Sequence, residues 1–242
     1  MTDDSAPTGR ALPPSSAFAG DDGSAPAELA AALAEPDRQQ RLEAVVEALR
    51  TVRVLVPVVS RLDEVGEHGI AGEKSAHAAM MTVAVPDGRA ALPVFSSVAA
   101  MAAWRADARP VPTEGRRAAL GAGADADGLL VVDPRGAAPV QVPRPAVRAI
   151  ALGEPWLPAV RNPAVLAEVN AVLREVPGVR WAGVEPGGVT EICLVVRLSR
   201  HPVGVPDPAT VETMGACHDA LATSQLLADL VDSVGVRPAI TH

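Results

Sequence analysis

The hydrophobic pattern is clearest over residues 80–104, where it predicts two strands, a tight turn and a helix. Apolar side chains alternate with small or polar ones over 81–85, which is the period of a half-buried strand. The Pro-Asp-Gly run at 86–88 favours a turn, because proline presets φ and glycine accepts a positive φ. Residues 91–95 return as a second strand. Pro93 has no N–H for a ladder hydrogen bond, so we expect this strand at a sheet edge or with a bulge.

The helix expected after this hairpin has a candidate cap at its start and a tryptophan near its end. Ser96 or Ser97 can cap it, because a serine hydroxyl accepts a hydrogen bond from an otherwise unpaired N–H of the first turn. Phe95 ends the second strand, and Trp104 lies near the end of the helix. A helix that packs back over the hairpin would therefore bring these two rings together.

The remainder of the chain divides into a tail and two structured parts. Residues 1–26 are rich in Pro, Ser, Ala, Gly and Asp without any period, which predicts a disordered tail. We expect a first domain over 27–152, a proline-rich linker at 153–163 and a second domain over 164–242. Each domain should pack helices on a small, mostly antiparallel sheet. The predicted fold class is therefore α+β.

Shorter periods within these domains predict the individual elements. In the first domain the expected helices, besides the one after the hairpin, are 27–34, 36–50, 113–120 and 145–152. Its other expected strands are 52–59, 128–132 and 139–142. In the second domain we expect a helix over 165–176, a strand hairpin at 179–198, helices on either side of Ser224 and a last strand at 235–240. Residues 192–196 are apolar on both faces, which predicts a central strand covered on both sides.

Around the Asp-Gly turn the chain resembles the signature of the SseB family, which is named for an enhanced-serine-sensitivity phenotype. Members share an N-terminal domain with an Asp-Gly turn, a Leu-Pro-Val-Phe-(Ser/Thr)-Ser run and a later tryptophan. The resemblance covers roughly residues 28–150, and residues 54–58 look like the family's first strand. The rest looks like the C-terminal extension of actinobacterial-type members. The matching residues are Asp87, Gly88, Leu92, Pro93, Val94, Phe95, Ser96, Ser97 and Trp104.

The resemblance implies a family but no activity, because no established catalytic residue accompanies the motif. We expect the matching residues to be structural, with the large apolar side chains packed in the core. The alternative is that Phe95, Ser96 and Ser97 line a binding pocket at the end of the hairpin.

Composition limits the partners that the chain can have. Its net charge is −8 without a basic run and only 2% of its residues are aromatic, which argues against nucleic acid as a partner. No stretch approaches the roughly 18 apolar residues of a membrane span. The acidic start lacks the apolar segment of a secretion signal. Cys193 and Cys217 are too few for a disulfide framework and indicate reduced thiols in the cytoplasm.

One segment gathers side chains that can bind metals. Residues 61–79 contain His68, Glu73 and His77. Imidazole and carboxylate groups bind Zn²⁺ and other divalent ions, but the spacing of the two histidines matches no rigid ligand template. A solvated loop between strands explains the same residues without a metal. A metal-dependent or small-molecule-processing enzyme that uses this loop is therefore the alternative function.

Other candidate motifs give no catalytic constellation. The G-x-G-x-x-A run at 121–126 follows a predicted helix and precedes a strand, the reverse of the order in a dinucleotide site. Cys217 and His218 are adjacent on a predicted helix, so their side chains point about 100° apart and do not form a nucleophile–base pair. Trp156 lies in the proline-rich linker, where it docks on the protein's own domain or on a partner.

These observations predict a non-enzymatic intracellular binding or interaction protein. Its partner is an unidentified protein or small molecule, and neither nucleic acid nor a membrane is expected. No catalytic residue, cofactor-binding residue or cofactor is predicted.

Overall fold

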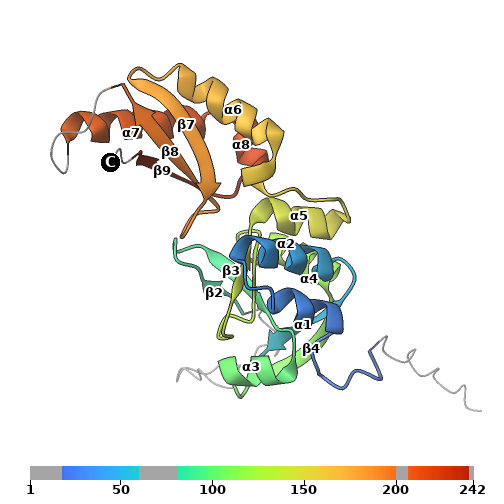
Figure 1. Cartoon of the computed structure of the whole chain (residues 1–242). Coiled ribbons are helices and arrows are strands. Elements are labelled where there is room, and N and C mark those ends of the chain that lie inside the picture. The colour runs from blue at the N-terminus through green and yellow to red at the C-terminus, as the bar shows by residue number, and fades with distance from the viewer. Residues whose placement is uncertain (1–17, 60–80, 200–206, 240–242) are drawn as a thin grey trace, which may run out of the picture.

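The computed structural model describes residues 18–59, 81–199 and 207–239 and has an α+β fold (Figure 1). Its two largest hydrophobic cores are separate from each other. We call the parts around these cores the N-terminal unit and the C-terminal unit. The chain passes from one core to the other between Trp156, which packs on the first, and Ala159, which is buried in the second. This passage lies inside the predicted proline-rich linker.

The N-terminal unit is built on a mixed sheet. Its strands are β1 (Arg53–Val58), β2 (Val83–Ala84), β3 (Ala90–Val94), β4 (Arg109–Glu114), β5 (Leu129–Val132) and β6 (Val140–Val142). Four of them pair in the order β2-β3-β5-β6, in which β3 and β5 are parallel and the two outer pairs are antiparallel. The antiparallel pair of β1 and β4 joins this sheet through a bridge between Leu55 and Phe95. The predicted hairpins at 81–95 and 128–142 are both present.

Helices cover one face of this sheet and bury their apolar stripes against it. The strand side chains on that face include Leu92, Val94, Leu130 and Val132, which form one core with the helices. The covering helices are α1 (Ala27–Leu33), α2 (Arg38–Leu49), α4 (Gly115–Asp125) and α5 (Arg144–Leu152), and α3 (Val98–Trp104) lies beside β1. The predicted helices at 27–34, 36–50 and 145–152 are therefore confirmed.

The helix predicted over 113–120 is present as α4, but its predicted start at Thr113 is wrong. Residues 109–114 form strand β4, and helix α4 begins only at Gly115. Pro110 and Pro112 conceal the strand in the sequence, because proline removes ladder donors. The two-stranded ladder of β1 and β4 accommodates both prolines, which lie opposite Pro57 and Leu55.

The position of Pro93 also differs from the expectation. Strand β3 is an inner strand, and its pairing with β5 is regular. However, β2 pairs only with Ala90 and Ala91, and β1 meets this segment only at Phe95. The backbone groups of Ala91, Pro93 and Phe95 point to the same edge of β3, the edge that faces β2 and β1. It therefore lies in a gap between β2 and β1, where no described strand needs an N–H from it.

Residues 18–26 belong to the N-terminal unit, so the predicted disordered tail extends too far. The guanidinium of Arg53 donates hydrogen bonds of 2.5 and 2.7 Å to the carboxylate of Asp21. Both side chains are close to nine-tenths buried. The carbonyl of Gly23 accepts a 2.9 Å hydrogen bond from the N–H of Val98. This segment is thus held against β1 and the start of α3.

The C-terminal unit is a smaller three-stranded sheet with helices on one face. Its strands are β7 (Val179–Pro186), β8 (Ile192–Leu198) and β9 (Val234–Pro238), and its helices are α6 (Pro163–Arg174), α7 (Pro208–Ala222) and α8 (Gln225–Leu230). β7 and β8 form the predicted antiparallel hairpin, and β9 adds parallel to β8. The side chain of Ser224 accepts a 3.3 Å hydrogen bond from the N–H of Leu227, which confirms the predicted break between α7 and α8.

Strand β8 is the central strand, as the sequence predicts, but its two faces differ. Ile192, Leu194 and Val196 are fully buried under the helices. On the other face Val195 is buried, Cys193 is half-buried, and Arg197, just beyond the predicted segment, is exposed. The predicted cover of residues 192–196 is therefore complete on the helix side and partial on the other.

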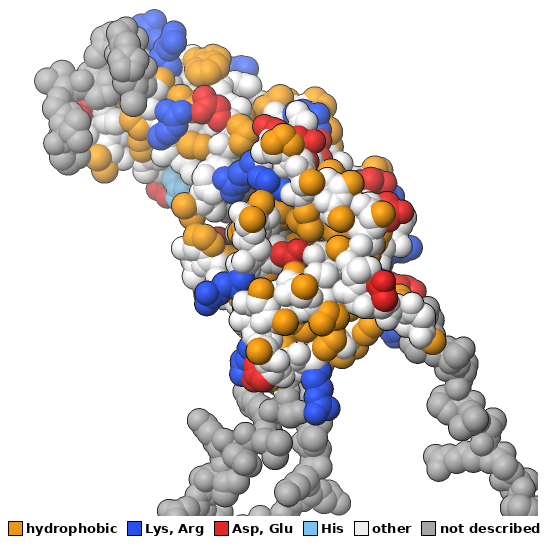
Figure 2. Space-filling view, turned by 60° about the horizontal axis from the view of Figure 1, so that its bottom comes forward, with side chains coloured by type: hydrophobic (Ala, Val, Ile, Leu, Met, Phe, Trp, Pro, Cys, Tyr) orange, Lys and Arg blue, Asp and Glu red, His pale blue; other side chains and the backbone are white. Residues whose placement is uncertain are grey.

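Charged side chains of both signs are mixed on the surface. On the face drawn in Figure 2, acidic and basic side chains are interspersed, with hydrophobic side chains between them. Among the helices of the described residues, none is long and apolar enough to cross a membrane.

Candidate functional site

A cavity of about 650 Å³ lies where the two units meet. The N-terminal unit contributes the start of α2, strand β2 and strand β6 to its walls. The C-terminal unit contributes the turn between β7 and β8. Figure 1 shows the β2–β3 hairpin reaching toward this turn. Trp156 and the short 3-10 helix Ala159–Arg161 also border the cavity, which we call the interunit cleft.

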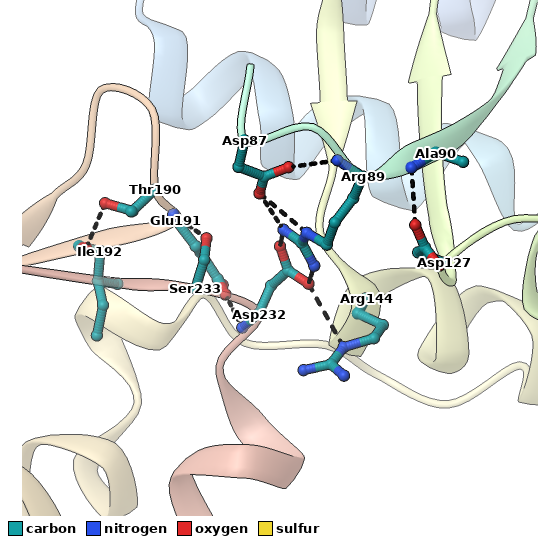
Figure 3. Close-up of polar contacts among 10 residues, drawn as sticks. All are labelled: Asp87, Arg89, Ala90, Asp127, Arg144, Thr190, Glu191, Ile192, Asp232 and Ser233. Atoms are coloured by element: carbon teal, nitrogen blue, oxygen red, sulfur yellow. Dashed lines mark hydrogen bonds and ion pairs between the residues drawn. The ribbon is translucent and has the colours of Figure 1, made fainter. Parts of the chain in front are cut away.

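Arg89 joins the two units beside the cleft (Figure 3). Its guanidinium donates hydrogen bonds of 2.8 and 2.6 Å to the two carboxylate oxygens of Asp232, whose side chain is only 1% exposed. Asp87 accepts bonds of 2.9 and 2.7 Å from the same guanidinium and fixes its orientation. Arg144 lies 3.4 Å from Asp232 on its other side. Two acidic and two basic side chains therefore compensate one another.

The Asp-Gly turn presents Arg89 to the C-terminal unit. The carbonyl of Val85 accepts a 2.8 Å hydrogen bond from the N–H of Gly88, and the N–H of Val85 donates a 2.9 Å bond to the carbonyl of Arg89. Gly88 has φ +87°, a conformation that glycine adopts without strain. Asp87 and Gly88 thus form the predicted turn, and Asp87 also orients Arg89.

Glu191 is a largely buried acid on the wall of the cleft. Its Oε2 accepts a 2.6 Å hydrogen bond from the N–H of Asp232, and its own N–H donates a 2.9 Å bond to the hydroxyl of Ser233 (Figure 3). Its Oε1 is buried and has no hydrogen-bond partner among the described residues. Loss of hydration raises the pKa of Glu191 to about 7, a rise that the backbone N–H groups of Asp232 and Ala159 partly offset. Near neutral pH this side chain is therefore partly protonated.

Glu191→Gln should gain stability relative to the wild type as the pH rises. The folded-state pKa near 7 lies above the ordinary value of 4.5, so ionisation of Glu191 destabilises the fold increasingly from about pH 5 to pH 8. The neutral amide avoids this penalty and still accepts from the N–H of Asp232. The difference in unfolding free energy should therefore grow by about 2 kcal/mol over that interval. Urea unfolding of both proteins at several pH values measures it, and a pH-independent difference would contradict the raised pKa.

Trp156 brings a second unsatisfied polar atom to the cleft. Its ring packs on the first core, which is the docking on the protein's own domain that the sequence left as one of two outcomes. Its indole Nε1 is buried and donates to no partner among the described residues. Buried polar groups are usually hydrogen-bonded. Trp156 and Glu191 therefore each place one buried polar atom without a hydrogen-bond partner, among the described residues, behind the surface of the cleft.

Two more contacts cross between the units along the cleft. Arg38, at the start of α2, donates hydrogen bonds of 3.3 and 3.0 Å to the carbonyls of Gly187 and Gly188 in the turn between β7 and β8. Arg161 forms an ion pair with Glu43 of α2. Together with Arg89, these side chains hold the two walls of the cleft to each other.

The large apolar residues of the motif pack inside the N-terminal unit. Leu92, Val94 and Phe95 are fully buried, and the ring centroids of Phe95 and Trp104 lie 5.2 Å apart. The two rings thus meet as the sequence predicts. Trp104 is half-buried and also borders the cleft. The contribution of these residues to stability stays a prediction.

The two serines of the motif have different partners. The hydroxyl of Ser97 accepts a 3.1 Å hydrogen bond from the N–H of Ala100 and so caps α3. Ser96 is buried, and its N–H and hydroxyl donate bonds of 2.9 and 2.6 Å to the carboxylate of Asp133. Asp133 has φ +47° in the turn before β6, a conformation that aspartate tolerates better than most residues. Neither serine is among the described residues that border the cleft.

The other candidates of the sequence add no site to the described part of the chain. His68, Glu73 and His77 lie outside the described residues, so the metal hypothesis is untested. Among the residues that are described, no group of three or more His, Cys, Asp or Glu could hold a metal ion. Cys217 is fully buried, which raises the pKa of its thiol, whereas His218 is exposed rather than partly buried. These two side chains form no hydrogen bond with each other.

Fold and cavity together define an α+β protein with two cores and a cleft between them. The SseB protein N-terminal domain, as a family, matches residues 27–149, which is about half of the chain. The chain therefore belongs to the SseB family. No curated protein and no solved structure matches it. The matched segment ends before the C-terminal unit, which supplies the other wall of the cleft.

Proposed function

We propose that this SseB-family protein is a non-enzymatic binding protein of the cytoplasm and that the interunit cleft holds a small-molecule ligand. The observation that carries the proposal is the cavity of about 650 Å³, a volume typical of small-molecule sites. Most of its lining residues are apolar, with a few polar groups such as those of Trp156 and Glu191. The two free thiols, Cys193 and Cys217, support a reducing compartment.

A ligand in this cleft would contact both units at once. The Arg89–Asp232 pair and the bonds from Arg38 to Gly188 hold the two walls together before any ligand arrives. A preformed site of this kind avoids part of the ordering cost of binding.

A thermal-shift screen with a metabolite library tests the proposal, with one variant that fills the cleft. Gly188 borders the cleft, and a Cβ added there would have open space around it. Gly188→Leu should therefore fold, and its larger side chain should fill part of the space that a ligand would occupy. Compounds that stabilise the wild type should stabilise this variant much less.

Gly215→Leu is the matched control. Gly215 also has open space around its Cβ, but it lies on α7 and does not border the cleft. The control should respond to the compounds as the wild type does. A compound that stabilises all three proteins equally binds elsewhere, and a set of such compounds alone would count against the cleft as the ligand site.

A further inference from the structure

The acids that border the interunit cleft carry little uncompensated charge. Asp232 is buried and is paired by Arg89 and Arg144. Glu191 has a pKa raised to about 7 by burial, so its average charge near neutral pH is only a fraction of one unit. The cleft is therefore far less acidic than a chain of net charge −8 would suggest.

The basic side chains on the N-terminal wall are not compensated in this way. Arg38 and Arg41 are three residues apart on α2 and so lie on one face of that helix. Arg38 bonds to backbone carbonyls and not to a carboxylate. Arg41 and Arg135 border the cleft, and the guanidinium of neither forms an ion pair or a hydrogen bond with another described residue. The local charge of the cleft is thus positive.

Apolar side chains form the rest of the lining beside these arginines. They come from α2, the first sheet, the connection between the units and the C-terminal unit, and they include Leu42, Val83, Val131, Val140, Trp156 and Ile192. A ligand that matches the cleft therefore has a large apolar body and a negative charge. A guanidinium pairs well with the oxygens of a carboxylate or phosphate, and such charge-assisted hydrogen bonds are stronger than those between neutral groups.

We propose that the cleft selects an amphipathic anion, with its apolar body against Trp156 and Leu42 and its anionic group at Arg41 and Arg135. This inference rests on the proposed function, because it names the class of ligand for the same cleft. The negative charge distinguishes this ligand from a neutral apolar molecule of the same shape. Electrostatic selection also predicts that binding weakens as the ionic strength rises.

Two fluorescent probes that share their aromatic rings test the proposal. Anilinonaphthalene sulfonate is an amphipathic anion, and phenylnaphthylamine is its neutral counterpart without the sulfonate. The wild type should bind the anionic probe more tightly. In the variant Arg41→Gln/Arg135→Gln, affinity for the anion should fall by about tenfold or more, since two charge-assisted contacts are lost. Affinity for the neutral probe should change by less than about twofold.

Arg174→Gln/Arg180→Gln is the control for a change of net charge. Both arginines are exposed, and neither borders the cleft. This variant should bind both probes as the wild type does. The proposal is overturned if the cleft variant keeps its affinity for the anion, if the control loses as much, or if the neutral probe weakens equally.

Gly188→Leu separates this inference from the proposed function. It should weaken both probes, because it fills part of the cleft. If it leaves both unchanged, the probes do not bind in the cleft, and the proposed function loses its support. If it weakens both while Arg41→Gln/Arg135→Gln weakens neither, the cleft remains a binding site and only the anionic ligand is excluded.

Discussion

Replacing Phe95 with alanine should lower the free energy of unfolding by about 3–5 kcal/mol. The Phe95 side chain is fully buried and packs with Leu55, Met101 and Trp104. Because only 2% of the residues are aromatic, few other large side chains are present to fill the cavity. A loss of this size is a large part of the stability of a typical domain. Urea unfolding followed by circular dichroism measures it.

Two further variants calibrate this result. Trp104→Ala should cost less, about 2–3 kcal/mol, because the Trp104 side chain is half-buried and loses less contact area. Leu120→Ala, on α4, removes a side chain that is 59% exposed and should stay within about 0.5 kcal/mol of the wild type. If Phe95→Ala also stays within about 1 kcal/mol, the motif is not a core element, and it should be reassigned to a binding surface.

The elements that the sequence predicts well are those whose pattern is local. Alternation and a Pro-Asp-Gly turn are enough to predict the hairpin that ends at Phe95, and a serine before an apolar helix is enough to predict the cap at Ser97. The contact of Phe95 with Trp104 follows from the same short segment. Strand β4 was not predictable in this way, because Pro110 and Pro112 read as a break in the pattern.

Pairings between distant segments could not be predicted from local periods. The parallel pairing of β3 with β5 joins segments that α3, β4 and α4 separate in the sequence. The sequence of neither strand indicates which other strand it pairs with. The cleft is an extreme case, because its walls come from segments as far apart in sequence as α2 and Asp232. Trp156 is a residue of the cleft that the sequence singled out, because a tryptophan in a proline-rich connection is expected to pack against another surface.

Glu191 and Arg89 show why the candidate site could not be predicted from the sequence. Each is a charged residue in or beside a turn, where solvated side chains are the rule. Only folding removes water from Glu191 and places Arg89 between the carboxylates of Asp87 and Asp232. An Asp-Gly turn predicts the backbone at Gly88, but it does not predict that Arg89 reaches the other unit.

Arg89→Gln should therefore have the second large effect, a loss of about 2–4 kcal/mol in the unfolding free energy. The substitution leaves the carboxylate of Asp232, which is almost fully buried, with Arg144 at 3.4 Å as its remaining ionic partner. The side chain of Arg89 is itself 27% exposed, which keeps the expected loss toward the lower part of the range for buried ion pairs. Urea unfolding measures the loss, and hydrogen exchange should show it as weaker protection at residues 232–238, where β9 begins beside the cleft.

The double variant Arg89→Gln/Asp232→Asn distinguishes a buried charge from lost packing. If the cost comes from the unpaired carboxylate of Asp232, removing its charge should recover a substantial part of the stability, and the two substitutions will be strongly non-additive. Asp87→Asn, which keeps the pair with Asp232 but weakens the hold on Arg89, should cost less than Arg89→Gln. Additive losses, with no change in protection at residues 232–238, would mean that Arg89 does not couple the two units.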